Sequence, residues 1–267
     1  MYTKKQLFEQ LEKMNAPRNS VVMVHSSLRS VGETEGRGEG LLEVLIDYFT
    51  SLGGLLCFPT HTWAFVKNSH TPALDLTTVR TCVGKLTELA AAHPDAIRSI
   101  HPTHSVAIFG NKERAKEYVS FDSVAETPAD PKGSFGRLYS ENGYVFLVGV
   151  GHNKNTYIHS VEEMLDVPNR LTENKINIPV KLADGSVIIR SNYCHHAEGI
   201  GDVSSHYPNY EPAFRHFGYI TDGMLGDAKT QLCSAVGMKE TVELIRKRSG
   251  GKELLFDDTP IDEKYYK

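Results

Sequence analysis

Short apolar runs alternate with amphipathic stretches along the first two thirds of the chain. Four runs rich in apolar, often β-branched residues are bounded by glycine, proline or polar residues, which is typical of buried strands: 20–28, 54–63, 104–110 and 143–151. Helical periodicity marks 40–52, 83–93, 112–119 and 156–165. This alternation predicts βα units, and therefore an α/β fold with a mostly parallel central sheet flanked by helices.

The pattern changes at about residue 174. Two runs of alternating apolar and polar residues are joined by Ala183-Asp184-Gly185, a good hairpin signal, and predict an antiparallel β annex in the C-terminal third. Helices are expected near 210–216 and 239–247, before a polar tail. No linker divides the chain. We therefore expect one domain over 1–267, with an α/β core at 1–173, the annex at 174–235, and a C-terminal helix and tail at 236–267.

Composition narrows the class of protein. A chain of 267 residues can bury a core without disulfides, and its four cysteines, Cys57, Cys82, Cys194 and Cys233, lack the spacing of a disulfide scaffold. The amphipathic N-terminal helix lacks the apolar segment of a signal peptide, and no segment has the roughly 20 apolar residues that span a bilayer. The net charge of −4 includes no basic stripe, which disfavours nucleic acid. We expect a soluble, cytoplasmic protein without a membrane or nucleic-acid partner.

Histidines and hydroxyls gather at the ends of the predicted strands. They are His25-Ser26-Ser27 after the first strand, Thr60-His61-Thr62 after the second, His101 to Ser105 at the start of the third, and Gly149 to His152 after the fourth. Ligands of α/β proteins bind in loops beyond the carboxyl ends of the strands. The sequence therefore predicts a site at one edge of the sheet, built from distant segments.

The segment after the fourth strand contains a candidate acid–base pair. Thr156 is placed to cap a helix, and His159 and Glu162 lie three residues apart on one face of that helix. A carboxylate beside an imidazole fixes its tautomer and raises its basicity, which suits a general base. Gly149 and Gly151 allow close backbone approach, but a complete G-x-G-x-x-G fingerprint is absent, so a dinucleotide site is disfavoured.

Other chemistries remain open from the residues alone. A metal site is an alternative, with ligands drawn from His101, His104, His195, His196, Glu162 and Asp202, although no tight zinc signature is present. A serine hydrolase is a second alternative, but G-x-S-x-G is absent. Ser26, Ser27 and Arg29 are candidates for binding a phosphate or amide group of a cofactor.

Five ordered blocks resemble a known family. The blocks VHSSLRSVG, GLLCFPTHTW, RSIHPTHSVAIFG, GSFGRL and VFLVGVGHNKNTYIHSVEE, within residues 24–163, are similar to those of the antibiotic N-acetyltransferase family, which includes the aminoglycoside 3-N-acetyltransferases. The resemblance implies acetyl transfer from acetyl-CoA, without a metal. The acceptor implied is a small-molecule amine, the 3-amino group of a 2-deoxystreptamine ring in a polycationic aminoglycoside-like substrate.

The resemblance also implies which residues form the site. The T-x-x-H element falls on Thr156 to His159, which makes His159 the base that deprotonates the amine, and Glu162 is the acid that follows it. His104 and His25 complete the implied catalytic set. The implied cofactor-binding residues are Ser26, Ser27, Leu28, Arg29, Phe58, Pro59, Thr60, Ser105 and Phe135. Donors for the developing oxyanion are sought among Ser105, Ser26 and Ser27.

The acceptor side is less well defined by the sequence. The resemblance thins after residue 174, the region expected to shape the acceptor pocket. Acidic candidates for contact with a cationic acceptor are Glu33, Glu35, Asp122, Asp202 and Glu211. Three alternatives stay open: acetylation of a different amine, a metal- or serine-dependent amidohydrolase, and a non-catalytic binding module. The sequence also leaves open the oligomeric state and which of His101 and His104 faces the site.

Overall fold

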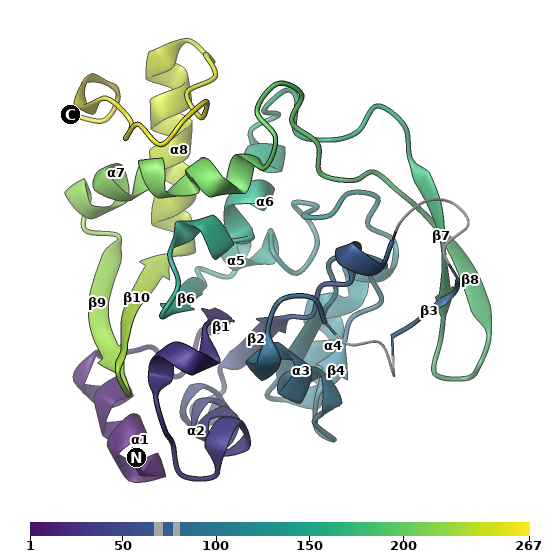
Figure 1. The fold of residues 1–267 in the computed structure, drawn as a ribbon, viewed down its shortest axis with the longest axis vertical. Coiled ribbons are helices and arrows are strands. Elements are labelled where there is room, and N and C mark those ends of the chain that lie inside the picture. The colour runs from purple at the N-terminus through teal and green to yellow at the C-terminus, as the bar shows by residue number, and fades with distance from the viewer. Residues whose placement is uncertain (67–71, 77–80) are drawn as a thin grey trace.

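A mixed sheet forms the centre of the molecule (Figure 1). The computed structural model describes residues 1–66, 72–76 and 81–267. Along the sheet, the strands are β4 (Ile97–Arg98), β5 (Val106–Phe109), β2 (Leu55–Pro59), β1 (Val21–Ser26), β6 (Tyr144–Val148), β10 (Ala228–Ser234) and β9 (Ile220–Leu225). The α/β class and the flanking helices predicted from the sequence are confirmed.

Only the middle of this sheet is parallel. β1 pairs in parallel with β2 and β6, whereas the other neighbouring strands pair antiparallel. The expectation of a mostly parallel sheet therefore holds for three central strands and not for the outer four. Because β5 runs opposite to β2, with Val106 beside Pro59, the start of β5 lies at the carboxyl edge of the central strands. This explains how residues before β5 reach the same edge as those after β1 and β2.

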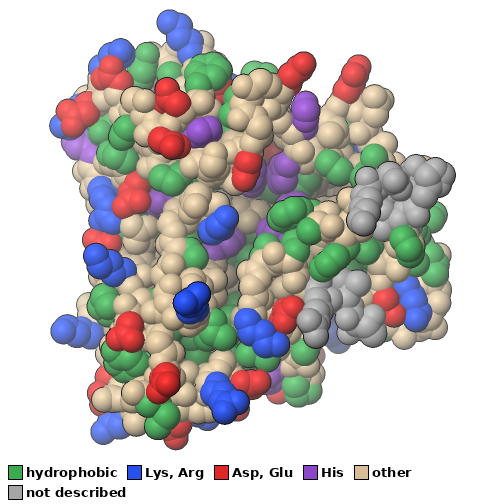
Figure 2. Space-filling view, viewed as in Figure 1, with side chains coloured by type: hydrophobic (Ala, Val, Ile, Leu, Met, Phe, Trp, Pro, Cys, Tyr) green, Lys and Arg blue, Asp and Glu red, His purple; other side chains and the backbone are tan. Residues whose placement is uncertain are grey.

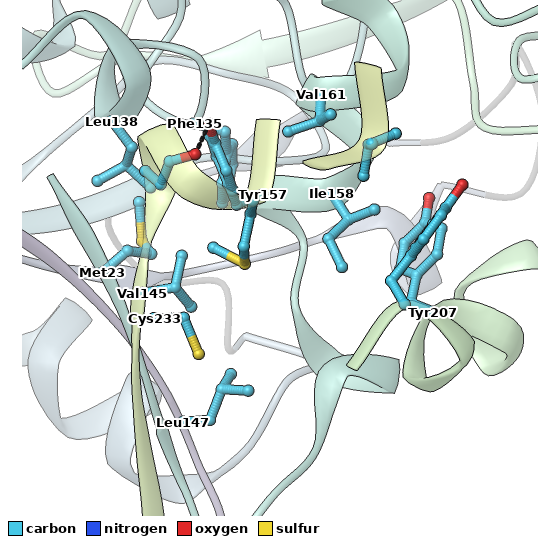
Figure 3. Packing of buried hydrophobic residues seen from close by; sticks show 14 of the residues in the cluster. Met23, Phe135, Leu138, Val145, Leu147, Tyr157, Ile158, Val161, Tyr207 and Cys233 are labelled. Atoms are coloured by element: carbon cyan, nitrogen blue, oxygen red, sulfur yellow. Dashed lines mark hydrogen bonds between the residues drawn. The ribbon is translucent and has the colours of Figure 1, made fainter. Parts of the chain in front are cut away.

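Helices cover both faces of the sheet (Figure 1). On one face, α1 (Lys4–Lys13), α2 (Arg37–Thr50) and α3 (Lys85–Ala92) pack on even-numbered β1 residues such as Val22. On the other are α4 (Lys112–Val119), α5 (Arg137–Ser140), α6 (Tyr157–Met164), α7 (Glu211–His216) and α8 (Ala235–Ser249). Figure 3 shows Tyr157 and Ile158 of α6 in the same cluster as Val145 and Leu147 of β6. Alternation along each strand thus divides the core into two apolar layers.

Short 3₁₀ segments connect the main elements. They are η1 (Leu28–Val31), η2 (Trp63–Phe65), η3 (Ser120–Ser123), η4 (His152–Lys154), η5 (Val203–Tyr210) and η6 (Glu263–Tyr265). The predicted helices agree with α1 to α4 and α6 to α8 within a few residues at each end. No described helix is long and apolar enough to cross a membrane.

A second, smaller sheet stands apart from the first (Figure 1). β7 (Ile176–Lys181) and β8 (Val187–Asn192) form the predicted antiparallel hairpin, and β3 (Leu74–Asp75) pairs in parallel with β7. Gly185 adopts a φ of 85° in the predicted turn, which a side chain would disfavour. β9 and β10, within the segment that the sequence assigned to the annex, instead extend the central sheet. The pairing of β10 with β6 is a long-range contact that the local pattern does not mark.

Candidate functional site

A cavity of about 890 Å³ opens beyond the carboxyl ends of the central strands. Its wall combines the end of β1, the loops that flank β2 and β5, the start of α6, and the loop from Cys194 to Ser204. Figure 2 shows histidine side chains gathered in a hollow of the visible face. The predicted convergence of distant segments at one edge of the sheet is therefore found.

His159 lies in this cavity and is held by a hydrogen-bonded chain. Its Nδ1 lies 2.7 Å from the hydroxyl of Tyr207, and that hydroxyl donates to Glu162 Oε2 at 2.5 Å. The direct distance from His159 Nδ1 to Glu162 Oε2 is 3.9 Å. His159 and Glu162 share a face of α6 as predicted, but Tyr207 stands between them. Thr156 is the N-cap residue of α6, as predicted, but its side chain makes no capping hydrogen bond.

Buried ion pairs continue the chain beyond Glu162. Arg170 donates from Nε to Glu162 Oε1 and from Nη2 to Glu253 Oε2, both at 2.7 Å. The side chains of Glu162 and Arg170 are only 1% and 5% exposed. Burial raises the pKa of Glu162, and the positive charge of Arg170 opposes this shift. A carboxylate with a guanidinium and a phenol as partners is stabilised in the charged form despite burial.

The hydrogen bonds from His159 through Tyr207 to Glu162 fix the tautomer of His159. The single proton of the Tyr207 hydroxyl goes to Glu162, so this oxygen accepts from His159, which must carry its proton on Nδ1. The remaining nitrogen, Nε2, has no hydrogen-bond partner among the described residues. Burial, helped by neighbouring His195, His61 and Arg170, holds the pKa of His159 well below its usual range. The ring is therefore neutral at neutral pH and can accept a proton at Nε2.

A row of imidazoles continues from His159 along the wall. The ring of His195 stacks on that of His159, with centroids 3.9 Å apart and an interplanar angle of 26°. His104 follows at 5.0 Å from His195, and His61 at 4.3 Å from His104. Burial lowers the pKa of His195 to about 4 and the pKa values of His104 and His61 well below 6.5. The row is thus uncharged at neutral pH.

Part of the wall carries buried polar atoms without partners. In the described parts of the chain, these are Nε2 of His25, His61 and His195, the hydroxyl of Ser26 and Oδ1 of Asn155, all from residues that line the cavity. Burial lowers the pKa of His25 to about 3. Because nearly all buried polar groups in proteins are hydrogen-bonded, such a group beside a cavity is suited to a ligand.

The structure separates His101 from His104. The Nδ1 atom of His101 accepts the backbone N–H groups of Thr103 and His104, at 3.1 and 2.9 Å, and its Nε2 lies 3.1 Å from the carbonyl of Thr127. Both of its nitrogens are thus used in holding the loop. His104 lines the cavity, whereas His101 does not.

The residues expected to bind the cofactor divide into two groups. Ser26 and Pro59 line the cavity, whereas Ser27, Leu28, Arg29, Phe58, Thr60, Ser105 and Phe135 do not. Phe58 lies in the core layer that packs against α1, α2 and α3, and its ring contacts that of Phe109. The hydroxyl of Ser105 donates to the Thr60 carbonyl at 2.9 Å, so it is not free to face a ligand. Phe135 lies behind His61, with ring centroids 5.7 Å apart.

Of the acidic candidates, only Asp202 lines the cavity. Asp122 is buried against the hydroxyl of Ser134 at 2.6 Å. Glu35 accepts the backbone N–H of Lys4, and Glu211 is paired with Arg215. Glu33 does not line the cavity either. Over residues 1–66, 72–76 and 81–267, no three His, Cys, Asp or Glu side chains are arranged to hold one metal ion.

Three contributors were not assigned these roles from the sequence: Tyr207, Arg170 and the stacked ring of His195. No local motif marks Tyr207, which lies 48 residues from His159. Arg170 follows Glu162 by eight residues, and this spacing does not predict a contact, because the two side chains meet only after the chain turns at the end of α6. His195 stood out only as one member of a histidine pair.

Comparisons with known proteins place this fold in a family. A family model described as aminoglycoside 3-N-acetyltransferase matches residues 23–246. The chain is 26% identical over 182 residues to the SPbeta prophage-derived aminoglycoside N(3')-acetyltransferase-like protein YokD of Bacillus subtilis (strain 168), covering 60% of this chain and 64% of that protein. It is 31% identical over 168 residues to aminoglycoside N(3)-acetyltransferase IV of Salmonella sp, covering 62% and 61%. The matches thus span less than two thirds of these two relatives.

Solved structures share the fold. The structure described as AAC-IIIb binary with CoASH superposes with a TM-score of 0.78 at 20% identity, covering 92% of this chain and 97% of that one. Two other neighbours, at 24% and 22% identity and TM-scores of 0.76 and 0.75, are described as a mutant of aminoglycoside acetyltransferase AAC(3)-IVa in complex with a gentamicin and with apramycin. A third, at 19% identity and a TM-score of 0.71, is described as AAC-VIa bound to sisomicin.

Proposed function

The chain belongs to the aminoglycoside 3-N-acetyltransferase family, and we propose that it transfers the acetyl group of acetyl-CoA to an amine of an aminoglycoside-like acceptor, with His159 as general base. The amine proposed is the 3-amino group of a 2-deoxystreptamine ring. The observation that carries the proposal is the hydrogen-bonded chain from His159 through Tyr207 to Glu162. This arrangement leaves Nε2 of the neutral His159 ring without a partner among the described residues. The cavity of about 890 Å³ around it has room for the thioester end of acetyl-CoA and for the attacking amine.

His159 would act through Nε2. As the amine nitrogen attacks the thioester carbon, a C–N bond forms and the N–H groups become acidic, so the imidazole can accept a proton. The resulting imidazolium keeps its Nδ1–H bond to Tyr207, whose proton points to Glu162. The C–S bond then breaks, and the thiolate of coenzyme A leaves and takes the proton held on His159 Nε2, which restores the neutral imidazole. The products are the acetylated amine and the free thiol.

Ser26 is the proposed donor to the developing oxyanion. Its hydroxyl is buried at the cavity and has no partner among the described residues, whereas the Ser105 hydroxyl donates to the Thr60 carbonyl and Ser27 does not line the cavity. Negative charge builds on the thioester oxygen during attack, and a pre-positioned donor stabilises it. This narrows the three serines expected from the sequence to one.

The cavity suits the cosubstrate and the acceptor. Pro59, Val150 and Cys82 offer apolar wall for a pantetheine arm, and Lys154 gives a positive charge for a phosphate. A structural neighbour bound to CoASH supports this use of the fold. Neighbours bound to a gentamicin, apramycin and sisomicin support an amino-sugar acceptor.

A thiol-release assay tests the proposal. Purified protein is incubated with acetyl-CoA and a panel of amines that includes aminoglycosides, with and without chelator. Acceptor-dependent release that is insensitive to chelator is expected. Hydrolysis of amides without coenzyme A would instead indicate the amidohydrolase, and binding without turnover would indicate a binding module.

The variant His159→Ala tests the assigned base. We expect it to lower kcat by about 10²–10⁴-fold, the usual contribution of a general base, with little change in affinity for coenzyme A. His216→Ala is the control, because His216 packs on Tyr266 and does not line the cavity. Near-normal turnover by His159→Ala would show that the base is another group.

A further inference from the structure

We propose that two copies of this chain associate through β8, whose outer edges pair antiparallel about a two-fold axis at Ile189. The two small sheets would then join into one continuous sheet. The residues of β8 do not line the cavity, so this surface is separate from the site of the proposed transfer.

β8 is the outermost strand of the small sheet. It pairs with β7 on one side, and β3 pairs with the opposite side of β7, so the second edge of β8 faces away from the sheet. Figure 1 shows the β7–β8 hairpin projecting from one side of the molecule. An edge strand presents main-chain donors and acceptors with which another strand can pair.

The register of the hairpin identifies the outward main-chain groups. In an antiparallel ladder, residue pairs that exchange hydrogen bonds alternate with pairs that do not. Leu182 donates its N–H to the Ser186 carbonyl at 2.8 Å, whereas Pro179, opposite Ile189, has no N–H to donate. The odd-numbered residues of β8 therefore direct their N–H and C=O groups away from β7: Val187, Ile189 and Ser191.

This outer edge is uncovered between Val187 and Ser191. No described segment outside the hairpin forms a main-chain hydrogen bond with the outward groups of these residues. The next outward N–H, that of Tyr193, donates to the Glu126 carbonyl at 2.8 Å. The part of the edge that can accept another strand therefore ends before Tyr193.

The same stretch of β8 exposes large apolar side chains. Val187 and Ile189 are 53% and 63% exposed, and Pro179 lies beside Ile189 on the same face of the hairpin. On the opposite face, Ile178 and Val180 are fully buried. A partner strand on this edge would thus bring main-chain pairing together with removal of apolar surface from water.

The edge is complementary to itself, which favours a second copy as the partner. A two-fold axis at Ile189 sets this residue opposite Ile189 of the second copy, and sets Val187 opposite Ser191. None of these three side chains is charged, so no like charges meet. The one charged residue of the strand, Arg190, lies on the other face, where its Nη2 donates to the Ala125 carbonyl at 2.9 Å.

Sedimentation velocity of the whole chain tests for the dimer. Over concentrations from about 1 to 200 µM, we expect a shift from monomer to dimer with a Kd on the order of 10 µM, because the paired edge is short. A chain that stays monomeric at the highest concentration would overturn the proposal.

A charge exchange at Ile189 tests the position of the axis. Ile189→Lys and Ile189→Glu each place two like charges side by side, so each variant alone should have a Kd at least about tenfold higher. An equimolar mixture sets opposite charges at the axis and should form a heterodimer with a Kd near that of the unaltered chain. A mixture that associates no more tightly than either variant alone would refute this axis.

Met224→Lys is the matched control. Met224 is 43% exposed on β9, the edge strand of the central sheet, and its variant should keep the original Kd. A dimer broken by Met224→Lys and unaffected by Ile189→Lys would assign the interface to β9 and overturn the proposal.

The thiol-release assay on the same proteins separates the dimer from the proposed transfer. Because Ile189 lies outside the cavity lining, Ile189→Lys should keep the kcat of the unaltered chain. A dimer that Ile189→Lys breaks, in a chain that acetylates no amine, would retain the interface and refute the transfer. Transfer by a chain that is monomeric throughout the concentration series would do the reverse.

Discussion

The two walls of the cavity differ in how their polar groups are satisfied. On the side of α6 and η5, His159, Tyr207, Glu162 and Arg170 form a continuous chain of hydrogen bonds. On the side of the strand ends, His25, Ser26 and His61 keep buried polar atoms that have no partner in the described ranges. The first wall is organised before any ligand binds. The second keeps buried polar atoms that are available to a ligand, so damage to the two walls should have different consequences.

The largest effect is expected from Arg170→Met, which breaks the organised wall. The variant leaves the buried carboxylate of Glu162 without its cation, and it should lower the free energy of unfolding by about 3–5 kcal/mol. Urea denaturation measures the loss. The double variant Arg170→Met/Glu162→Gln removes the uncompensated charge and should regain most of the stability. A stable single variant would mean that this wall does not depend on the ion pair.

Ser26→Ala should show the opposite behaviour on the unpartnered wall. Loss of one oxyanion donor lowers kcat by about 10²-fold or more, whereas stability should not fall because no internal hydrogen bond is lost. Ser105→Ala is the control: its hydroxyl bonds the Thr60 carbonyl, so it should lose about 1 kcal/mol of stability and keep its kcat. Steady-state kinetics and thermal unfolding measure both quantities. If Ser26→Ala and Ser105→Ala changed kcat and stability to the same extent, the proposed difference between the two walls would be wrong.

Acid should destabilise the unpartnered wall through its neutral histidines. Burial lowers the pKa of His25 to about 3 in the folded protein, against 6.5 as its ordinary value, so the unfolded chain binds more protons between these limits. Stability therefore falls as pH decreases from about 6.5 towards 3, by at most about 2 kcal/mol from this residue between pH 7 and pH 5. Urea unfolding of the protein and of the His25→Asn variant at pH 7 and pH 5 measures the contribution of His25 to the loss of stability. An identical pH dependence in both proteins would contradict it.

The smallest effect is expected from Tyr207→Phe, which removes a positioning residue. Without the hydroxyl, the imidazolium of His159 loses its link to Glu162, so kcat should fall about tenfold, the loss expected from one hydrogen bond of about 1.4 kcal/mol to a charged group. The pKa of His159 should fall further, moving the acid limb of the kcat/KM profile to lower pH. A purely structural role would lower activity without this shift. Profiles of both proteins from about pH 5 to pH 9 measure it.

Much of the fold follows from local pattern. The strands β1, β2 and β6 and the helix α4 are marked by short apolar runs and by helical periodicity, which depend on burial of nearby residues. The antiparallel direction of β5 and the addition of β9 and β10 to the central sheet are not so marked, because strand direction depends on pairing with distant partners. The site was predictable to a similar extent. His159, Glu162, His104, His25 and Ser26 were expected there, whereas Phe58 and Ser105 are turned away from the cavity.

The sequence by itself determined the α/β class, the position of the site at the strand ends, and the pair His159 and Glu162 on one helix face. Only the tertiary structure decided that Tyr207 joins the pair, that His195 stacks on His159, and that Asp202 alone brings a carboxylate into the described lining. The reason is physical. Helix periodicity fixes neighbours within a few residues, whereas contacts between distant loops are set by the packing of the whole sheet and its helices.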